Sequence, residues 1–230
     1  FLPVISSPAA QSPPDPVFPN NVFATTPARL IIGHMRHPIR RQETQRPDIR
    51  GFFTDTLGYR EIDLSTQAGI CELTGSLIID RARGIGYCGL SERCDESGAL
   101  AMAAAFNLKA CLVFDLAADE YHTNVVLSVL ASRAVVVAPS GFRNAAVPEA
   151  IAGFYGGRAI RLSETQKGEY AGNCIALTDN CVFLSQRALD SLDCAQHAQF
   201  TDYGFELKPV ALPMLERAGG SLRCCVGEIF

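Results

Sequence analysis

Residues 72–116 contain one complete structural unit, which begins with ELTGSLIID (72–80), continues with IGYCGL (85–90) and ends with ACLVFDL (110–116). The three apolar runs are bounded by turn residues, a pattern that is typical of strands. The alanine-rich segment between the second and third runs (91–107) has the composition of a helix. This unit is therefore predicted to fold as strand, turn, strand, helix, strand.

The same order of segments recurs on both sides of this unit. It returns after His122, beginning with TNVVLSVL (123–130) and AVVVAP (134–139), and again after Asn173, while a looser copy follows Asn21. Self-similarity at a period near fifty residues indicates a repeat architecture. Because such units cannot bury their apolar faces alone, we expect neighbouring units to pack side by side into a ring.

Five polar residues mark the period. Asn21, Glu72, His122, Asn173 and Cys224 are 51, 50, 51 and 51 residues apart, and each precedes an apolar run. Equivalent positions in a ring converge on its axis, so these side chains are expected to share one site. A thiol, an imidazole and a carboxyl group are residue types used for covalent and acid–base catalysis.

Local signals define the ends of the predicted helices. Ser91 and Ser185 stand at positions suited to helix N-caps, where a hydroxyl accepts a hydrogen bond from an unpaired backbone N–H. Gly156 and Gly157 stand where a helix should end, since glycine adopts the left-handed conformation readily.

The last unit is incomplete in this sequence. LRCCVGEIF (222–230) is expected to be its first strand, and Phe1–Ser6 its last strand, without the segments that would lie between them. We therefore interpret residues 1–230 as a single catalytic domain that lacks an N-terminal segment.

Composition excludes several classes of protein. The chain has 230 residues, of which 48% are hydrophobic and 19% charged, and these values are ordinary for one globular domain. A net charge of -4 argues against nucleic-acid binding. No apolar run reaches about 18 residues, so no membrane span is expected. The arginines between Arg36 and Arg50 are predicted to form a solvated helix face, or alternatively to supply one ligand for a substrate carboxylate.

Nine cysteines without a secretory signal indicate reduced thiols and a cytoplasmic protein. No pair of CxxC motifs is present, so a structural zinc site is not expected. Most of these cysteines should behave as small buried hydrophobic residues. Cys224 differs because it follows GGSLR and completes the periodic series.

Several motifs together resemble the guanidino-group-modifying superfamily, also called penteins. These motifs are PDPVFPNN (14–21), CELTGSLIIDR (71–81), YHTNVV (121–126), EYAGN (169–173) and GGSLRC (219–224). The sequence is most similar to the amidinotransferase-related branch that includes citrulline-utilisation hydrolases. The resemblance extends from about Pro13 to Phe230.

This resemblance implies an α/β fold, a five-bladed α/β propeller of repeated ββαβ units with one blade incomplete in this chain. It further implies that Cys224 is the nucleophile, His122 the general acid and base, and Glu72 the carboxylate that holds substrate nitrogen and orients the histidine. No metal or other cofactor is expected. The expected partner is a small guanidino or ureido compound, and a homo-oligomer is possible because it could seal the open blade.

Two positions depart from the arginine deiminase pattern. Asn21 and Asn124 stand where those enzymes have aspartates, and together with Asn173 they are expected to bind substrate. An amide both donates and accepts hydrogen bonds, which favours a neutral ureido group or dihydrolase chemistry over a tightly held guanidinium. Hydrolysis is the leading hypothesis, with amidino transfer through the same thiol and a non-catalytic binding role as the alternatives.

Overall fold

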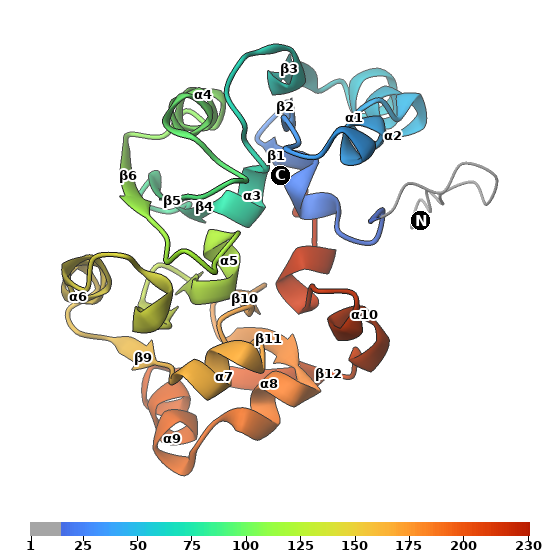
Figure 1. The fold of residues 1–230 in the computed structure, drawn as a ribbon. Coiled ribbons are helices and arrows are strands. Elements are labelled where there is room, and N and C mark those ends of the chain that lie inside the picture. The colour runs from blue at the N-terminus through green and yellow to red at the C-terminus, as the bar shows by residue number, and fades with distance from the viewer. Residues whose placement is uncertain (1–14) are drawn as a thin grey trace.

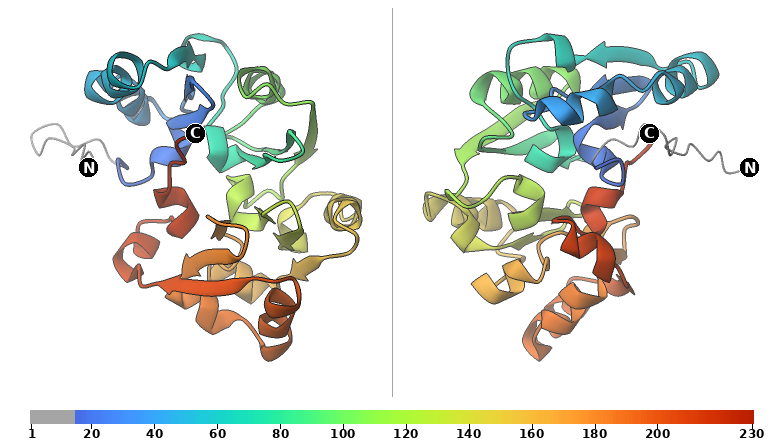
Figure 2. Two further views of the ribbon diagram at one scale, coloured as in Figure 1. Left: turned by 180° about the vertical axis from the view of Figure 1, so that it is seen from behind. Right: turned by 45° about the vertical axis from the view of Figure 1, so that its right-hand side comes forward.

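Four similar units surround a common centre in the computed structural model, which describes residues 15–230 (Figure 1). Each unit contributes one three-stranded sheet. The expected strand Phe1–Ser6 lies outside the described residues. The views in Figure 2 show the units side by side around the centre, and no unit covers another.

The first two units span residues 19 to 115. The first comprises η2 (Pro19–Asn21), β1 (Phe23–Thr26), β2 (Arg29–Ile32), η3 (Pro38–Arg40), α1 (Arg41–Thr44), α2 (Pro47–Gly51), the π-helical turn η4 (Phe52–Thr56), β3 (Arg60–Asp63) and η5 (Leu64–Thr66). The second comprises α3 (Leu73–Ser76), β4 (Leu77–Asp80), β5 (Ile85–Leu90), α4 (Glu96–Ala105) and β6 (Ala110–Asp115).

The remaining elements span residues 123 to 225. The third unit comprises α5 (Thr123–Val126), β7 (Leu127–Leu130), β8 (Ala134–Val137), η6 (Pro139–Gly141), α6 (Ala146–Phe154) and β9 (Ala159–Arg161), and α7 (Glu164–Gly168) follows it. The fourth comprises β10 (Ile175–Ala176), β11 (Cys181–Ser185), α8 (Gln186–Ser191), α9 (Cys194–Asp202) and β12 (Glu206–Val210), followed by α10 (Pro213–Arg217) and η7 (Leu222–Cys225).

All four sheets have the same topology. The first two strands form an antiparallel hairpin, and the third strand pairs in parallel with the second, as in β4-β5-β6. A parallel pair needs a long crossover, which α4 and α6 supply in the second and third units. The predicted order of strand, turn, strand, helix, strand is therefore confirmed. Figure 1 shows α4, α6 and α9 on the outer rim, whereas α3 and α5 face the centre.

The described residues contain four sheets and no fifth one. The strand expected at 222–230 was wrong, because Leu222–Cys225 form the 3₁₀ turn η7 and residues 226–230 belong to no sheet. A strand needs a neighbour for its backbone hydrogen bonds. β1 lies beside this segment, but Thr25 of β1 bonds to it through its side-chain hydroxyl, and no backbone ladder forms.

The periodic residues stand before short helical turns in the second and third units. The apolar runs after Glu72 and His122 were expected to be strands throughout, but Leu73–Ser76 and Thr123–Val126 each form one helical turn before the strand starts. All the residues of both turns are buried. A buried turn and a buried strand have the same apolar composition, so periodicity alone could not distinguish them.

The predicted helix boundaries were partly correct. Ser185 caps α8, since its side chain accepts a hydrogen bond from Ala188 N (3.0 Å). Gly156 and Gly157 follow α6 with positive φ angles of 65° and 78°. The assignment of Ser91 was wrong, because Asp95 caps α4 by accepting from Gly98 N (2.7 Å).

The arginine-rich segment does not form one solvated helix face. Prolines at positions 38 and 47 start separate short helices, since proline cannot continue a preceding helix. Arg40 is buried and forms an ion pair with Glu43 at 2.8 Å. The prediction that this cluster is solvated was therefore wrong for Arg40.

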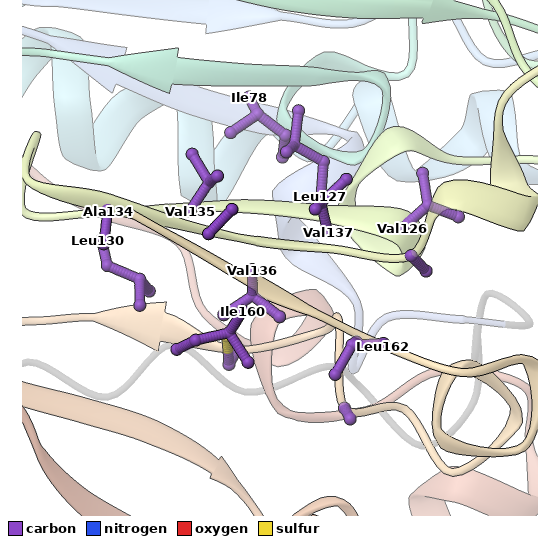
Figure 3. Close-up of a cluster of buried hydrophobic side chains, with 14 of the residues drawn as sticks. Ile78, Val126, Leu127, Leu130, Ala134, Val135, Val136, Val137, Ile160 and Leu162 are labelled. Carbon is purple, nitrogen blue, oxygen red and sulfur yellow. The ribbon is translucent and has the colours of Figure 1, made fainter. Parts of the chain in front are cut away.

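The hydrophobic core is continuous between neighbouring units. Figure 3 shows β7 and β8 presenting apolar side chains on both faces of their sheet, with Ile78 of β4 on one side and Ile160 of β9 on the other. Val135 and Val136 are fully buried. Because one cluster includes residues of the second, third and fourth units, the packing of each unit depends on its neighbours.

No helix within residues 15–230 is both long and apolar enough to cross a membrane.

A buried carboxylate joins the second and third units. Asp80, at the end of β4, accepts hydrogen bonds from Arg83 Nη1 (2.8 Å), from Tyr155 Oη (2.7 Å) and from the hydroxyl of Ser132. Burial alone would raise the pKa of Asp80, but these hydrogen bonds outweigh it and lower the pKa. Ser132 lies in the β7–β8 turn with a positive φ angle of 56°. The carboxylate therefore holds a strained turn of the adjacent unit in place.

Asp80→Asn is expected to reduce the free energy of unfolding by about 2–4 kcal/mol, because the amide leaves the hydroxyl donors of Tyr155 and Ser132 and the partly exposed guanidinium of Arg83 without a charged acceptor. Urea denaturation followed by circular dichroism measures this loss. Asp115→Asn is the matched control, since Asp115 forms a solvent-exposed pair with Arg143. Equal stability of the two variants would contradict a role for Asp80 in joining the units.

Candidate active site

The periodic polar residues are buried and approach the centre from different units. Glu72 precedes α3, His122 precedes α5, and Cys224 lies in η7. Their exposed fractions are 0%, 2% and 4%. Figure 1 shows α3, α5 and the segment before the C-terminus facing the same central region. The convergence expected from the period is therefore present in the structure.

Glu72 and His122 form a direct pair. His122 Nε2 donates to Glu72 Oε2 at 2.9 Å. Glu72 also contacts Arg93 Nη1 (3.2 Å) and accepts from Arg36 N (3.1 Å). The carboxylate thus fixes the imidazole orientation, while Nδ1 of the ring bonds to no described residue.

The charge states of this pair follow from their surroundings. Burial alone would raise the pKa of Glu72, but the hydrogen bond from His122 and the positive charge of Arg93 lower the pKa to about 2. Burial lowers the pKa of His122 and outweighs the opposite effect of Glu72. At neutral pH, Glu72 is therefore an anion and His122 is a neutral base.

Two asparagine side chains surround the thiol of Cys224. Asn173 Nδ2 lies 3.4 Å from Sγ, and Asn124 Nδ2 lies 3.8 Å from it. Asn173 Nδ2 also donates to the backbone carbonyl of Asn124 (2.9 Å), which fixes the Asn173 side chain beside residue 124. These amide N–H groups can stabilise negative charge on the sulfur.

Cys224, His122 and Asn21 line one cavity of about 260 Å³. The other lining residues are Asp15, Phe18, Arg40, Arg93, Tyr121, Ala218, Gly219 and Gly220. Glu72, Asn124 and Asn173 lie behind this wall, in contact with residues that line it. The structure thus brings all six predicted site residues into one region, with three of them at the cavity surface.

Asn21 presents an unpaired acceptor in this region. Its Oδ1 is buried and has no hydrogen-bond partner among residues 15–230. A Cβ atom on Gly75 would lie 2.5 Å from this oxygen and 3.1 Å from the His122 ring. Glycine at position 75 therefore leaves room for both side chains.

A family model described as N,N dimethylarginine dimethylhydrolase, eukaryotic, matches residues 2–230. The chain belongs to the N,N-dimethylarginine dimethylhydrolase family. This membership confirms the superfamily predicted from the motifs. A search of curated proteins gave no sequence match.

Solved structures show that members of related families share this mixed α/β fold. The N-terminal domain of ArgZ, an arginine dihydrolase from cyanobacteria, crystallised as a cysteine-to-serine variant with substrate, has a TM-score of 0.79 at 18% identity, covering 93% of this chain and 75% of that one. AgrE bound to L-arginine has a TM-score of 0.78 at 20% identity, covering 93% and 31%. A dimethylarginine dimethylaminohydrolase adduct with S-methyl-L-thiocitrulline has a TM-score of 0.71 at 20% identity, covering 92% and 76%.

Arg93 and Tyr121 were not predicted as cavity residues of this dimethylarginine dimethylhydrolase family member, whereas an arginine between Arg36 and Arg50 was the alternative ligand predicted for a substrate carboxylate, and Arg40 lines the cavity. Arg93 and Arg40 place two guanidinium groups at the cavity, and Tyr121 packs on His122 with ring centroids 4.9 Å apart. Arg93 and Tyr121 lie in loops, Arg40 ends the 3₁₀ turn η3, and none of them recurs with the period. Tyr121 directly precedes the periodic residue His122, and Arg93 follows β5 in a polar segment. Proximity to a periodic residue or to the end of a strand was therefore the sequence signal that could have identified these two residues.

Burial suppresses the ionisation of three other thiols in this family member. All nine cysteines are free. Burial raises the pKa of Cys71 and of Cys174 to about 12, and that of Cys225 to about 11. These thiols stay protonated at neutral pH, as small buried side chains do. Residues 15–230 contain no cluster of three or more His, Cys, Asp or Glu side chains that could hold a metal ion.

Proposed function

We propose that this protein is a cysteine-dependent hydrolase of a C–N bond in a guanidino or ureido compound. The observation that carries this proposal is the cavity shared by Cys224 and His122, with Glu72 bonded to the imidazole at 2.9 Å. Membership in the dimethylarginine dimethylhydrolase family supports it. Residues 1–230 form one catalytic domain in this proposal. The complete ring would be a five-unit propeller, and the protein would act in the reducing cytoplasm.

The geometry supports a two-step reaction. His122 accepts the thiol proton as Cys224 attacks the central carbon, which forms a C–S bond. His122 then gives this proton to the departing nitrogen, and the C–N bond breaks. A water molecule, deprotonated by His122, attacks the remaining thio-linked intermediate, and cleavage of the C–S bond restores the cysteine.

The amide side chains suit a substrate group with little or no positive charge. Asn21 Oδ1 can accept a substrate N–H, and its amide nitrogen can donate to a ureido oxygen. Asn124 and Asn173 direct N–H groups toward the sulfur, where negative charge is needed during attack. We infer that the enzyme acts on a citrulline-like compound, or as a dihydrolase on an arginine-derived one, as ArgZ is described to do.

Arg40 and Arg93 are positioned to bind a carboxylate group of the substrate. Both guanidinium groups line the cavity, where the carboxylate of Asp15 is the only acidic side chain among the described lining residues. Arg40 already binds both carboxylate oxygens of Glu43, and Arg93 contacts Glu72 and Glu92, so their remaining N–H groups would hold a substrate carboxylate by charge-assisted hydrogen bonds. The proposed substrate is therefore an amino acid that carries a guanidino or ureido group.

The direct test is a panel of arginine, citrulline, agmatine, methylated arginines and succinylarginine, with ammonia, amine and urea as the measured products. We expect turnover of compounds that have an α-carboxylate and little with agmatine, which has none. Glycine is added in parallel, because formation of guanidinoacetate would indicate amidino transfer in place of hydrolysis. Absence of any product across the panel would refute the proposed function.

Asn21→Asp is expected to raise the ratio of kcat/KM for arginine to that for citrulline by about tenfold, because a carboxylate forms a stronger, charge-assisted hydrogen bond with a guanidinium than an amide does. Steady-state kinetics with both substrates measure the ratio. Asn180→Asp, in the exposed β10–β11 turn, is the matched control. An unchanged ratio in the Asn21 variant would contradict the assignment of Asn21 as a specificity residue.

A further inference from the structure

The segment after Cys224 is attached to the first and second units. Thr25 of β1 donates from Oγ1 to Glu228 O (2.8 Å) and accepts from Phe230 N (3.0 Å). The ring of Phe230 lies 3.7 Å from the guanidinium carbon of Arg81. Figure 1 places the C-terminal end of the chain beside β1. The segment 226–230 is therefore fixed in place without being part of a sheet.

Glu228 is the charged centre of this attachment. Its Oε2 lies 3.4 Å from Arg81 Nη2 and 3.3 Å from Arg223 Nη2. Arg81 stands at the end of the β4 strand, whereas Arg223 directly precedes Cys224. One carboxylate thus links the hairpin of the second unit to the turn that carries the thiol.

Arg223 is held at three points. Its backbone N donates to Asn173 Oδ1 (3.0 Å), its Nη1 donates to Val226 O (2.9 Å), and its Nη2 contacts Glu228. Asn173 uses its other amide atom to contact the sulfur of Cys224. A displacement of Arg223 would therefore change both the position of Cys224 and the amide that faces it.

The guanidinium of Arg223 depends on Glu228 electrostatically. Its side chain is only 9% exposed. Arginine keeps its proton under all ordinary conditions, and a buried charge without a counter-ion is strongly unfavourable. Without the carboxylate of Glu228, the guanidinium of Arg223 would move toward water and displace the turn η7, which contains Cys224. A misplacement of about 1 Å in an active site can reduce the rate roughly 100-fold.

We propose that Glu228 is a positioning residue for Cys224 and acts through Arg223. The effect on turnover rests on the proposed function, whereas the effect on the thiol does not. Glu228 and Arg81 lie outside the active-site cavity and line a separate one of about 260 Å³ together with Arg223. Glu228 therefore supports the position of Cys224 from outside the active-site cavity and does not contact the substrate.

The test compares Glu228→Gln with the intact protein. We expect kcat to fall about tenfold with KM changed less than twofold, because the substrate contacts are retained. Mass spectrometry of the Cys224 peptide after timed iodoacetamide treatment should show at least threefold faster labelling, because the 4% exposed thiol becomes accessible when its turn loosens. Glu149→Gln, which removes an exposed carboxylate paired with Arg161, should change neither value.

Arg81→Gln separates the route through Arg223 from a general loosening of the C-terminal segment. This variant removes the other arginine from Glu228 and keeps the Arg223 pair, so kcat and labelling should stay within twofold of the intact protein. Equal effects of Arg81→Gln and Glu228→Gln would overturn the proposed route, as would unchanged labelling in Glu228→Gln. If the intact protein turned over no compound of the panel, the proposed function would be refuted, and the labelling rates would still decide the role of Glu228.

Discussion

Cys224→Ser should reduce kcat by at least about 10⁴-fold while the fold is retained, because a serine hydroxyl is a far weaker nucleophile than a thiolate toward a resonance-stabilised carbon. The substitution changes one atom of a side chain that is 4% exposed, so the packing around it is preserved. Substrate binding should persist, since Asn21, Arg40 and Arg93 are unchanged. Turnover on the substrate panel and isothermal titration of the variant measure the two quantities.

Cys225→Ser is the matched control for this substitution. The neighbouring thiol contacts Ser221 O at 3.4 Å and does not line the cavity. This variant should therefore keep activity within about twofold, as surface or peripheral substitutions generally do. Equal activity of the Cys224 and Cys225 variants would refute the assignment of the nucleophile.

Glu72→Gln should lower kcat by about 10²–10⁴-fold, because the anion that orients His122 and stabilises its protonated form is lost. The Glu72 carboxylate opposes the decrease in the pKa of His122 that burial causes. Its removal should lower the pKa of His122 further, so the loss of activity on acidification should move to lower pH. The pH dependence of kcat/KM between about pH 4 and pH 9 measures this shift.

Glu92→Gln provides the matched control for Glu72, because both carboxylates contact Arg93 and only Glu72 contacts His122. Glu92 is exposed, so its replacement should leave the pH profile in place. A Glu72 variant with the profile and kcat of the Glu92 variant would contradict the proposed coupling of carboxylate and imidazole. Circular dichroism establishes that both variants are folded.

Much of the fold could be predicted because the apolar runs and turn residues repeat. The run AVVVAP contains strand β8 (Ala134–Val137), whose residues are all buried, and the short polar turn Asp179-Asn180 joins β10 to β11. The helical turns Leu73–Ser76 and Thr123–Val126 could not be predicted, because buried turns and buried strands share one composition. The 3₁₀ turn at Leu222–Cys225 depends on which strands are available as neighbours, and sequence alone does not give this.

The candidate site was predictable to the extent that it follows the period. Glu72, His122 and Cys224 stand at equivalent chain positions, so a ring brings them together whatever their loops do. Arg40 reaches the cavity from the 3₁₀ turn η3 and Arg93 from the loop after β5, and no period marks them. The roles of Asp80 and Glu228 depend on contacts between residues that are 52 and 147 positions apart in the chain.

The three groups that the proposed reaction needs are distributed among three parts of the ring. The carboxylate comes from the second unit, the imidazole from the third, and the sulfur from the turn after the fourth. No excised unit can therefore carry out the chemistry, however well it folds. The proposed reaction would therefore depend on the contacts between the units, and opening one junction should abolish it while most strands and helices stay intact.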